Sequence, residues 1–95
     1  NIIFLELKRK GYRVYVGKNE EKEVDFVVET GDDYIYIQVS LSVRDEKTLE
    51  RELKPLETIQ DHYKKYLITL DYDTNNYNGI KQISPMDFLL GRVEL

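Results

Sequence analysis

Three polar side chains interrupt two apolar stretches of this sequence and can form one polar site. Asp25 stands inside the first stretch, Glu23–Val28, and Gln38 and Ser40 end the second. The stretches are separated by residues 31–33, a pattern typical of two antiparallel strands joined by a tight turn. We therefore expect the Asp25 carboxylate to lie beside the Gln38 amide and the Ser40 hydroxyl.

A purely structural role is the alternative for the same side chains. Asp25 can pair across the strands with Lys18 or Lys22. Gln38 can hydrogen-bond the strand backbone or Tyr36. The residues alone leave both interpretations open.

Glu6 is a further candidate, because helical spacing places it on or beside a buried stripe. Ile2, Ile3 and Leu7 follow that spacing, and Gly11 is the expected end of the helix. Taken alone, Glu6 is interpreted as an ordinary carboxylate at the edge of a buried face.

Several kinds of catalytic site are excluded by residue type. The sequence has no cysteine, so it can form neither a disulfide nor a thiolate metal site. It also has no glycine-rich phosphate loop and no Ser/His/Asp arrangement. Its single histidine, His62, has no cysteine or histidine neighbour, so we interpret it as a surface residue.

The elements that must position these residues begin with a helix and a three-strand meander. The first strand is expected over 12–18, followed by the two stretches described above. Because side chains alternate along a strand, Val24, Phe26 and Val28 are expected on one face and Asp25 on the other.

The second half of the chain predicts a helix, two strands and a short final helix. Asp45 is the expected N-cap of the helix, its apolar stripe starts at Leu49, and Pro55 should kink it. The remaining expectations are a strand buried on both faces at 66–70, a mobile loop at 71–79, a strand at 80–83 and a helix at 86–90 begun by Ser84-Pro85.

Length and composition indicate one domain over residues 1–95. The hydrophobic fraction of 41% argues against disorder, and the net charge of −4 counts against tight DNA binding by this domain alone. We find no signal peptide and no apolar run that could span a bilayer. The sequence does not begin with methionine, so we expect a fragment of a longer cytoplasmic protein.

The element order and the positions of the polar residues resemble the PD-(D/E)xK nuclease superfamily, which has the restriction-endonuclease-like fold. More closely, the chain looks like the C-terminal domain of unknown function found on many bacterial and archaeal AAA-type ATPases. The segments that carry this resemblance are NIIFLEL at 1–7, GY at 11–12, EVDF at 23–26 and IYIQV at 35–39.

The resemblance implies an α/β fold with a central mixed sheet, in the order α-β-β-β-α-β-β-α, flanked by helices. It also implies Asp25, Gln38 and Glu6 as ligands of Mg²⁺, with an uncharged amide oxygen where the second acid belongs. Ser40 stands at the position of the family's lysine, which orients the attacking water and offsets charge on the phosphate. A neutral serine cannot supply that charge, so we expect a degenerate site.

Three functions are weighed on this basis. The first is an inactive nuclease-fold module that recognises a partner or nucleic acid and is joined in one chain to an ATPase domain. The second is an active Mg²⁺-dependent DNA endonuclease or exonuclease with a displaced cation from Lys18, Lys22 or Arg44. The third is an interaction domain unrelated to nucleases. DNA is a candidate partner, an oligomer is allowed, and no membrane partner is expected.

Tyrosine is abundant, with eight residues in 95, and exposed tyrosine rings can stack on nucleobases. Tyrosines inside strand patterns more often fill cross-strand pairs and the rim of a core. We interpret these tyrosines as packing residues.

Overall fold

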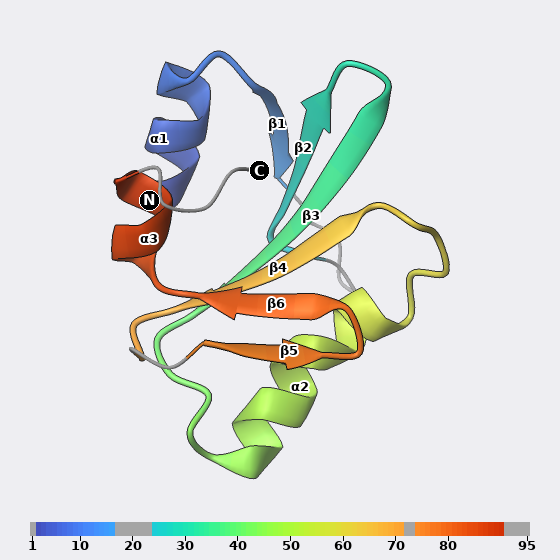
Figure 1. Ribbon diagram of the computed structural model, residues 1–95, viewed down its shortest axis with the longest axis vertical. Helices are drawn as coiled ribbons and strands as arrows, with labels where there is room; N and C mark the ends of the chain where they lie inside the picture. The colour runs from blue at the N-terminus through green and yellow to red at the C-terminus, as the bar shows by residue number, and fades with distance from the viewer. Residues whose placement is uncertain (1, 17–23, 72–73, 91–95) are drawn as a thin grey trace.

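The computed structural model describes residues 2–16, 24–71 and 74–90, which form three helices and six strands (Figure 1). None of the helices in these ranges is long and apolar enough to cross a membrane. The elements are α1 Ile2–Arg9, β1 Arg13–Val16, β2 Phe26–Thr30, β3 Asp33–Ser40, α2 Glu46–Glu57, β4 Lys64–Thr69, β5 Asn75–Tyr77, β6 Ile80–Ile83 and α3 Pro85–Leu89.

All six strands belong to one mixed sheet in the order β1-β2-β3-β4-β6-β5. The first three strands form the expected antiparallel meander, with Phe26 opposite Ile37 and Val28 opposite Ile35. Strands β3, β4 and β6 run parallel, and β5 pairs antiparallel with β6. The helix α2 makes the crossover between the parallel strands β3 and β4, so the expected mixed α/β architecture is confirmed.

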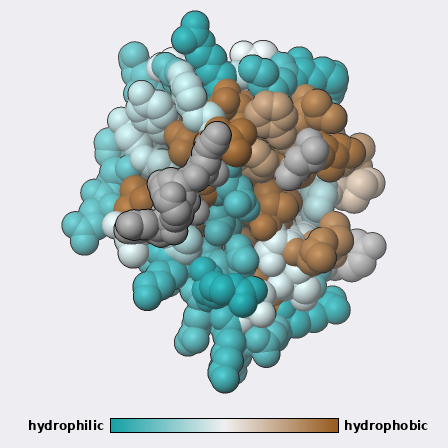
Figure 2. Space-filling model, turned by 180° about the vertical axis from the view of Figure 1, so that it is seen from behind, coloured by the Kyte–Doolittle hydropathy of each residue, from teal (hydrophilic) through white to brown (hydrophobic). Residues whose placement is uncertain are grey.

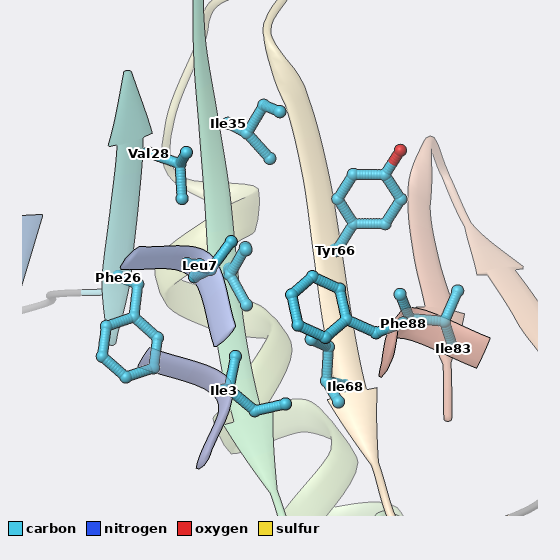
Figure 3. Close-up of a cluster of buried hydrophobic side chains, with 10 residues drawn as sticks. Ile3, Leu7, Phe26, Val28, Ile35, Tyr66, Ile68, Ile83 and Phe88 are labelled. Carbon is cyan, nitrogen blue, oxygen red and sulfur yellow. The ribbon is translucent and has the colours of Figure 1, made fainter. Parts of the chain in front are cut away.

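The larger hydrophobic core lies between the sheet and the helices α1 and α3, which sit near each other in Figure 1. Side chains from both helices point at the same four strands, as Figure 3 shows. The buried members of this core are Ile3, Leu7, Phe26, Val28, Ile35, Ile37, Tyr66, Ile68, Ile83 and Phe88.

The helix α2 covers the opposite face with a smaller core. Leu53 and Leu56 supply the buried side chains of the helix and pack with Leu67 and Ile80 from the sheet. Two glutamines, Gln38 and Gln82, are also buried. Buried amides cost free energy unless they are hydrogen-bonded, so each of them should have partners.

Helix boundaries follow the expected local chemistry. The carboxylate of Asp45 accepts a hydrogen bond from the backbone N–H of Thr48, as an N-cap does. The hydroxyl of Ser84 caps α3, with Pro85 in its first turn. Gly11 has a φ of 89°, and its N–H bonds to the carbonyl of Lys8, which ends α1 as expected.

The predicted loop at 71–79 is wrong in part, because it contains the strand β5. Asn78 and Gly79 both have positive φ, at 54° and 94°, which are the values of a tight hairpin turn between β5 and β6. An Asn-Gly pair is a strong hairpin signal, and the sequence carried it. The observed order therefore has one strand more than predicted.

The predicted face of Val24 is also wrong. Val24 packs in the smaller core, whereas Phe26 and Val28 belong to the larger one. The reason is that Asp25 lies in a bend, one residue before β2 begins. Strict alternation holds only inside an extended strand, so it does not extend back to Val24.

Candidate functional site

Asp25 and Gln38 are brought together, as the sequence predicted. The backbone N–H of Asp25 donates to Oε1 of Gln38 at 2.8 Å. In return, Oδ2 of Asp25 accepts from the backbone N–H of Val39 at 2.9 Å. These two bonds tie the residue that precedes β2 to the second half of β3. Gln38 therefore bonds to backbone, at the residue just before β2.

Gln38 also joins the sheet to α2, which the sequence did not predict. Its Nε2 donates to Oε1 of Glu52 at 3.2 Å, and Oε2 of Glu52 lies 4.0 Å from Nε of Arg51. Charged side chains on a helix usually face solvent. Glu52 nevertheless lies three residues after Leu49 and four before Leu56, so helical spacing places it beside the apolar stripe.

Ser40 does not extend toward Asp25. Its hydroxyl donates to the backbone carbonyl of Ser42 at 3.2 Å, within the loop that follows β3. Ser40 is half-buried and lies opposite Thr69 of β4. The position at which the resemblance places a lysine therefore holds a short neutral side chain bonded to its own loop.

Glu6 pairs within its own helix. Its carboxylate accepts from Nε of Arg9 at 3.0 Å and from Nη2 of Arg9 at 2.5 Å. The hydrogen bond from Arg9 lowers the pKa of Glu6. Among the residues that the structure describes, no hydrogen bond or ion pair joins Glu6 to Asp25 or Gln38. The helix α1 covers the face of the sheet opposite to α2, toward which Gln38 points.

Three cations are candidates to replace the missing lysine. Lys18 and Lys22, also considered as partners of Asp25, lie outside the described residues. Arg44 is engaged elsewhere, with Nε 3.4 Å from Oδ1 of Asp71. The described part of the chain thus places no cation against Asp25.

Asp71 is the second polar centre, and sequence patterning placed it in a loop. Only 4% of it is exposed, at the carboxyl end of β4 beside the loop that leaves β3. Its Oδ2 accepts from the N–H of Val43 at 2.9 Å, and its Oδ1 accepts from the hydroxyl of Ser42 at 2.9 Å. These bonds, with Arg44 nearby, lower the pKa of Asp71 despite its burial. Asp71 therefore holds the loop that leads into α2.

The donor set does not fit the Mg²⁺ site that the resemblance implies. Asp25 offers one carboxylate, and the amide oxygen of Gln38 already accepts a hydrogen bond. No group of three or more acidic or histidine side chains that could hold a metal ion occurs among the described residues. Magnesium prefers several hard oxygen ligands in near-octahedral geometry, which these two residues do not supply.

Comparison with known proteins gives one informative relative. No protein-family model and no solved structure matches this chain. An uncharacterized protein of Haemophilus influenzae is 41% identical to it over 91 residues. The match covers 95% of this chain but only 22% of the relative. The chain therefore spans about a fifth of the length of that protein.

Proposed function

We propose that this chain is a nuclease-fold domain that has lost phosphodiester cleavage and serves in recognition. The observation that carries the proposal is the pair of hydrogen bonds between Asp25 and the segment 38–39. The family's acidic position is kept, but its carboxylate and the neighbouring amide now bond to backbone. A site used in this way stabilises the sheet.

Ser40 supports the loss of catalysis. Cleavage of a phosphodiester needs a metal or a cation to stabilise charge that develops on the phosphate. The serine hydroxyl is neutral and bonded to Ser42, and Arg44 is held by Asp71. Neither residue supplies the positive charge at Asp25 that the reaction requires.

The proposal places the domain in a longer polypeptide. The match to only 22% of the Haemophilus influenzae relative supports a domain of a larger protein. The resemblance to domains attached to AAA-type ATPases suggests an ATPase in the same chain, in the cytoplasm. DNA remains a candidate partner of the whole protein.

A plasmid-nicking assay with Mg²⁺ and with Mn²⁺ tests the loss of activity. The wild-type protein is expected to nick no more than Asp25→Ala. Metal-dependent nicking by the wild type that disappears in Asp25→Ala would establish the alternative, an active nuclease with a displaced cation.

The structural role of Asp25 gives a second measurement. Asp25→Ala removes the acceptor of the Val39 N–H and is expected to cost roughly 1–3 kcal/mol of unfolding free energy. Asp25→Asn keeps an acceptor oxygen and is expected to cost less. Equal unfolding free energies for the wild type and both variants would contradict a structural use of this carboxylate.

The double variant Gln38→Glu, Ser40→Lys tests descent from a metal site. It rebuilds the two charged positions that the family carries, and it is expected to gain Mn²⁺ binding in calorimetry. The gain should disappear when Asp25→Ala is added. Failure to gain any metal binding would contradict the inherited site.

A further inference from the structure

A cavity lies at the far end of the β2–β3 hairpin from Asp25. Its volume is about 220 Å³, and it is lined by residues of the β2–β3 hairpin and of the segment that leads into β4. With a strand rise of about 3.3 Å per residue, the length of β2 puts the cavity roughly 15 Å from Asp25. It is therefore a separate site.

Aromatic rings form the walls of this cavity. The rings of Tyr34 and Tyr63 have centroids 5.5 Å apart and are inclined at 74°, so they make two sides of a corner. The ring of His62 lies 4.6 Å from that of Tyr63. Tyr34 is 38% exposed, which leaves part of its ring open to a flat ligand.

Asp61 holds the backbone of the segment that carries Tyr63. Oδ1 of Asp61 accepts from the backbone N–H of Tyr63 at 2.9 Å and from Nζ of Lys65 at 3.0 Å. Its Oδ2 accepts from the hydroxyl of Tyr36 at 2.8 Å. Burial raises the pKa of Asp61, but these hydrogen bonds outweigh it and lower the pKa overall. A segment held in this way loses little conformational entropy when a ligand binds.

Two charged groups of opposite sign line the same cavity. Asp33 and Lys64 are both exposed, and none of the described residues engages the carboxylate of Asp33 or the amine of Lys64. A carboxylate accepts hydrogen bonds from the amino and imino groups of a nucleobase edge. An amine contacts a phosphate. Aromatic walls, a carboxylate and an amine together match the face and the edge of a nucleobase and the adjoining phosphate.

We propose that this cavity binds one unpaired base of a single-stranded nucleic acid, with guanine preferred. The base stacks on Tyr34 against the edge of Tyr63, and the Asp33 carboxylate accepts from the two adjacent donors of guanine. Lys64 contacts the neighbouring phosphate. The cavity is smaller than the ~300–1,000 Å³ of pockets for drug-sized ligands, which suits a single ring system.

This inference does not depend on descent from a nuclease. It also revises the packing interpretation of the tyrosines for two of them only. Tyr36 and Tyr77 are partly buried, and their hydroxyls bond to Asp61 and Gln82. These two remain packing residues.

The test uses fluorescence anisotropy with labelled thymidine 11-mers that carry one central guanine, one central thymine or one central abasic site. The guanine strand is expected to bind most tightly and the abasic strand least. An RNA strand of the same design reports whether the sugar matters. With one amine in contact with a single strand, the logarithm of affinity should fall with the logarithm of salt concentration with a slope of about 0.7.

Four variants assign the binding to the cavity. Tyr34→Ala is expected to weaken binding of the guanine strand about ten-fold, within the range found for stacked aromatics. Tyr34→Phe keeps the ring and should retain binding. Asp33→Asn should remove the preference for guanine. Tyr15→Ala, at a tyrosine that is 51% exposed but outside the cavity, is the matched control and should bind as the wild type.

Three results would overturn the proposal. The first is absence of saturable binding of any strand to the folded wild-type protein. The second is equal affinity for the guanine and abasic strands, which would indicate contact with backbone alone. The third is unchanged binding in Tyr34→Ala after its fold has been confirmed by circular dichroism.

Discussion

The two faces of the sheet bury different kinds of side chain. The hydrophobic core under α1 and α3 has ten buried residues, and the hydrophobic core under α2 has six. The buried amide of Gln38 bonds to Glu52 of α2, and that of Gln82 accepts from Tyr77 of the neighbouring strand β5. The first face is built for stability. The α2 face also buries polar groups, and their hydrogen bonds position the strands and the helix relative to each other.

The polar contacts of the α2 face are nearly complete. Gln38 bonds to Asp25 and Glu52, and Gln82 bonds to Thr69, Asn75 and Tyr77. Satisfied amides cost little, whereas removing one partner leaves a buried group unpaired. We therefore predict that substitutions under α1 and α3 lower stability by leaving a cavity. Substitutions of the buried amides under α2 should lower stability by leaving hydrogen-bonding groups unpaired.

The largest effect is expected for Phe88→Ala on the α1 and α3 face. Phe88 is fully buried, so its truncation removes apolar contact and leaves a cavity. We expect a loss of about 3–5 kcal/mol in the free energy of unfolding, measured in urea. Met86→Ala, on the same helix but 52% exposed, should change it by less than about 0.5 kcal/mol. Similar losses for both would contradict this assignment of the core.

Gln82→Leu tests the polar face at nearly constant volume. The variant deprives the Thr69 and Tyr77 hydroxyls of their partner amide. We expect a loss of about 1–3 kcal/mol in unfolding free energy. Lys81→Ala, exposed on the same strand, is the control. A stabilised Gln82→Leu protein would mean that the hydrogen bonds of Gln82 are not needed for the stability of the α2 face.

Asp71→Asn tests the charge that holds the loop before α2. The pKa of Asp71 is lowered by its bonds to Val43 and Ser42, so the native state favours the ionised form. Its contribution to stability is present above the ordinary carboxyl pKa near 4 and disappears as pH falls through the lowered native value. The urea midpoint of Asp71→Asn should lie below that of the wild type at pH 7, and the gap should close in acid. Asp32→Asn, in the exposed turn, is the control and should leave the urea midpoint at pH 7 close to that of the wild type.

The smallest effect is expected for Tyr36→Phe. Burial and the hydrogen bond to Asp61 raise the pKa of Tyr36 to about 12. Because the native pKa lies above the unfolded value near 10, the stability that Tyr36 contributes is complete below pH 10 and is lost as pH rises toward 12. At neutral pH the variant should lose roughly 0.5–1.5 kcal/mol. Urea midpoints and tyrosinate absorbance between pH 9 and 12 measure both effects.

Local sequence signals predicted most of the architecture. The turn at 31–32, the caps at Asp45 and Ser84 and the stop at Gly11 all depend on a few neighbouring residues. The meander, the crossover helix and the buried strand β4 followed from apolar patterning. The strand β5 was missed because two of its three residues, Asn75 and Asn76, have little strand propensity, and β6 supplies the pairing that makes them a strand.

The candidate site was predicted only where two strands are adjacent in the chain. Asp25 and Gln38 are 13 residues apart and joined by a hairpin, so a local pattern brings them together. The partner of Gln38 on α2 and the partners of Asp71 28 and 29 residues away depend on how layers pack. The position of Glu6 relative to Asp25 shows the same limit, because it depends on how α1 packs. Its pairing with Arg9, three residues further along the same helix, is a local contact that helical spacing allows.

Both edge strands of the sheet are short. β1 has four residues and β5 has three, whereas β3 in the interior has eight. A short edge strand offers few unpaired backbone groups to an incoming strand, so self-association by strand addition is disfavoured. Any contact with the rest of a larger polypeptide should therefore use side chains. Leu5 of α1 and Leu90 at the end of α3 are exposed, and Figure 2 shows apolar groups gathered on one side of the molecule.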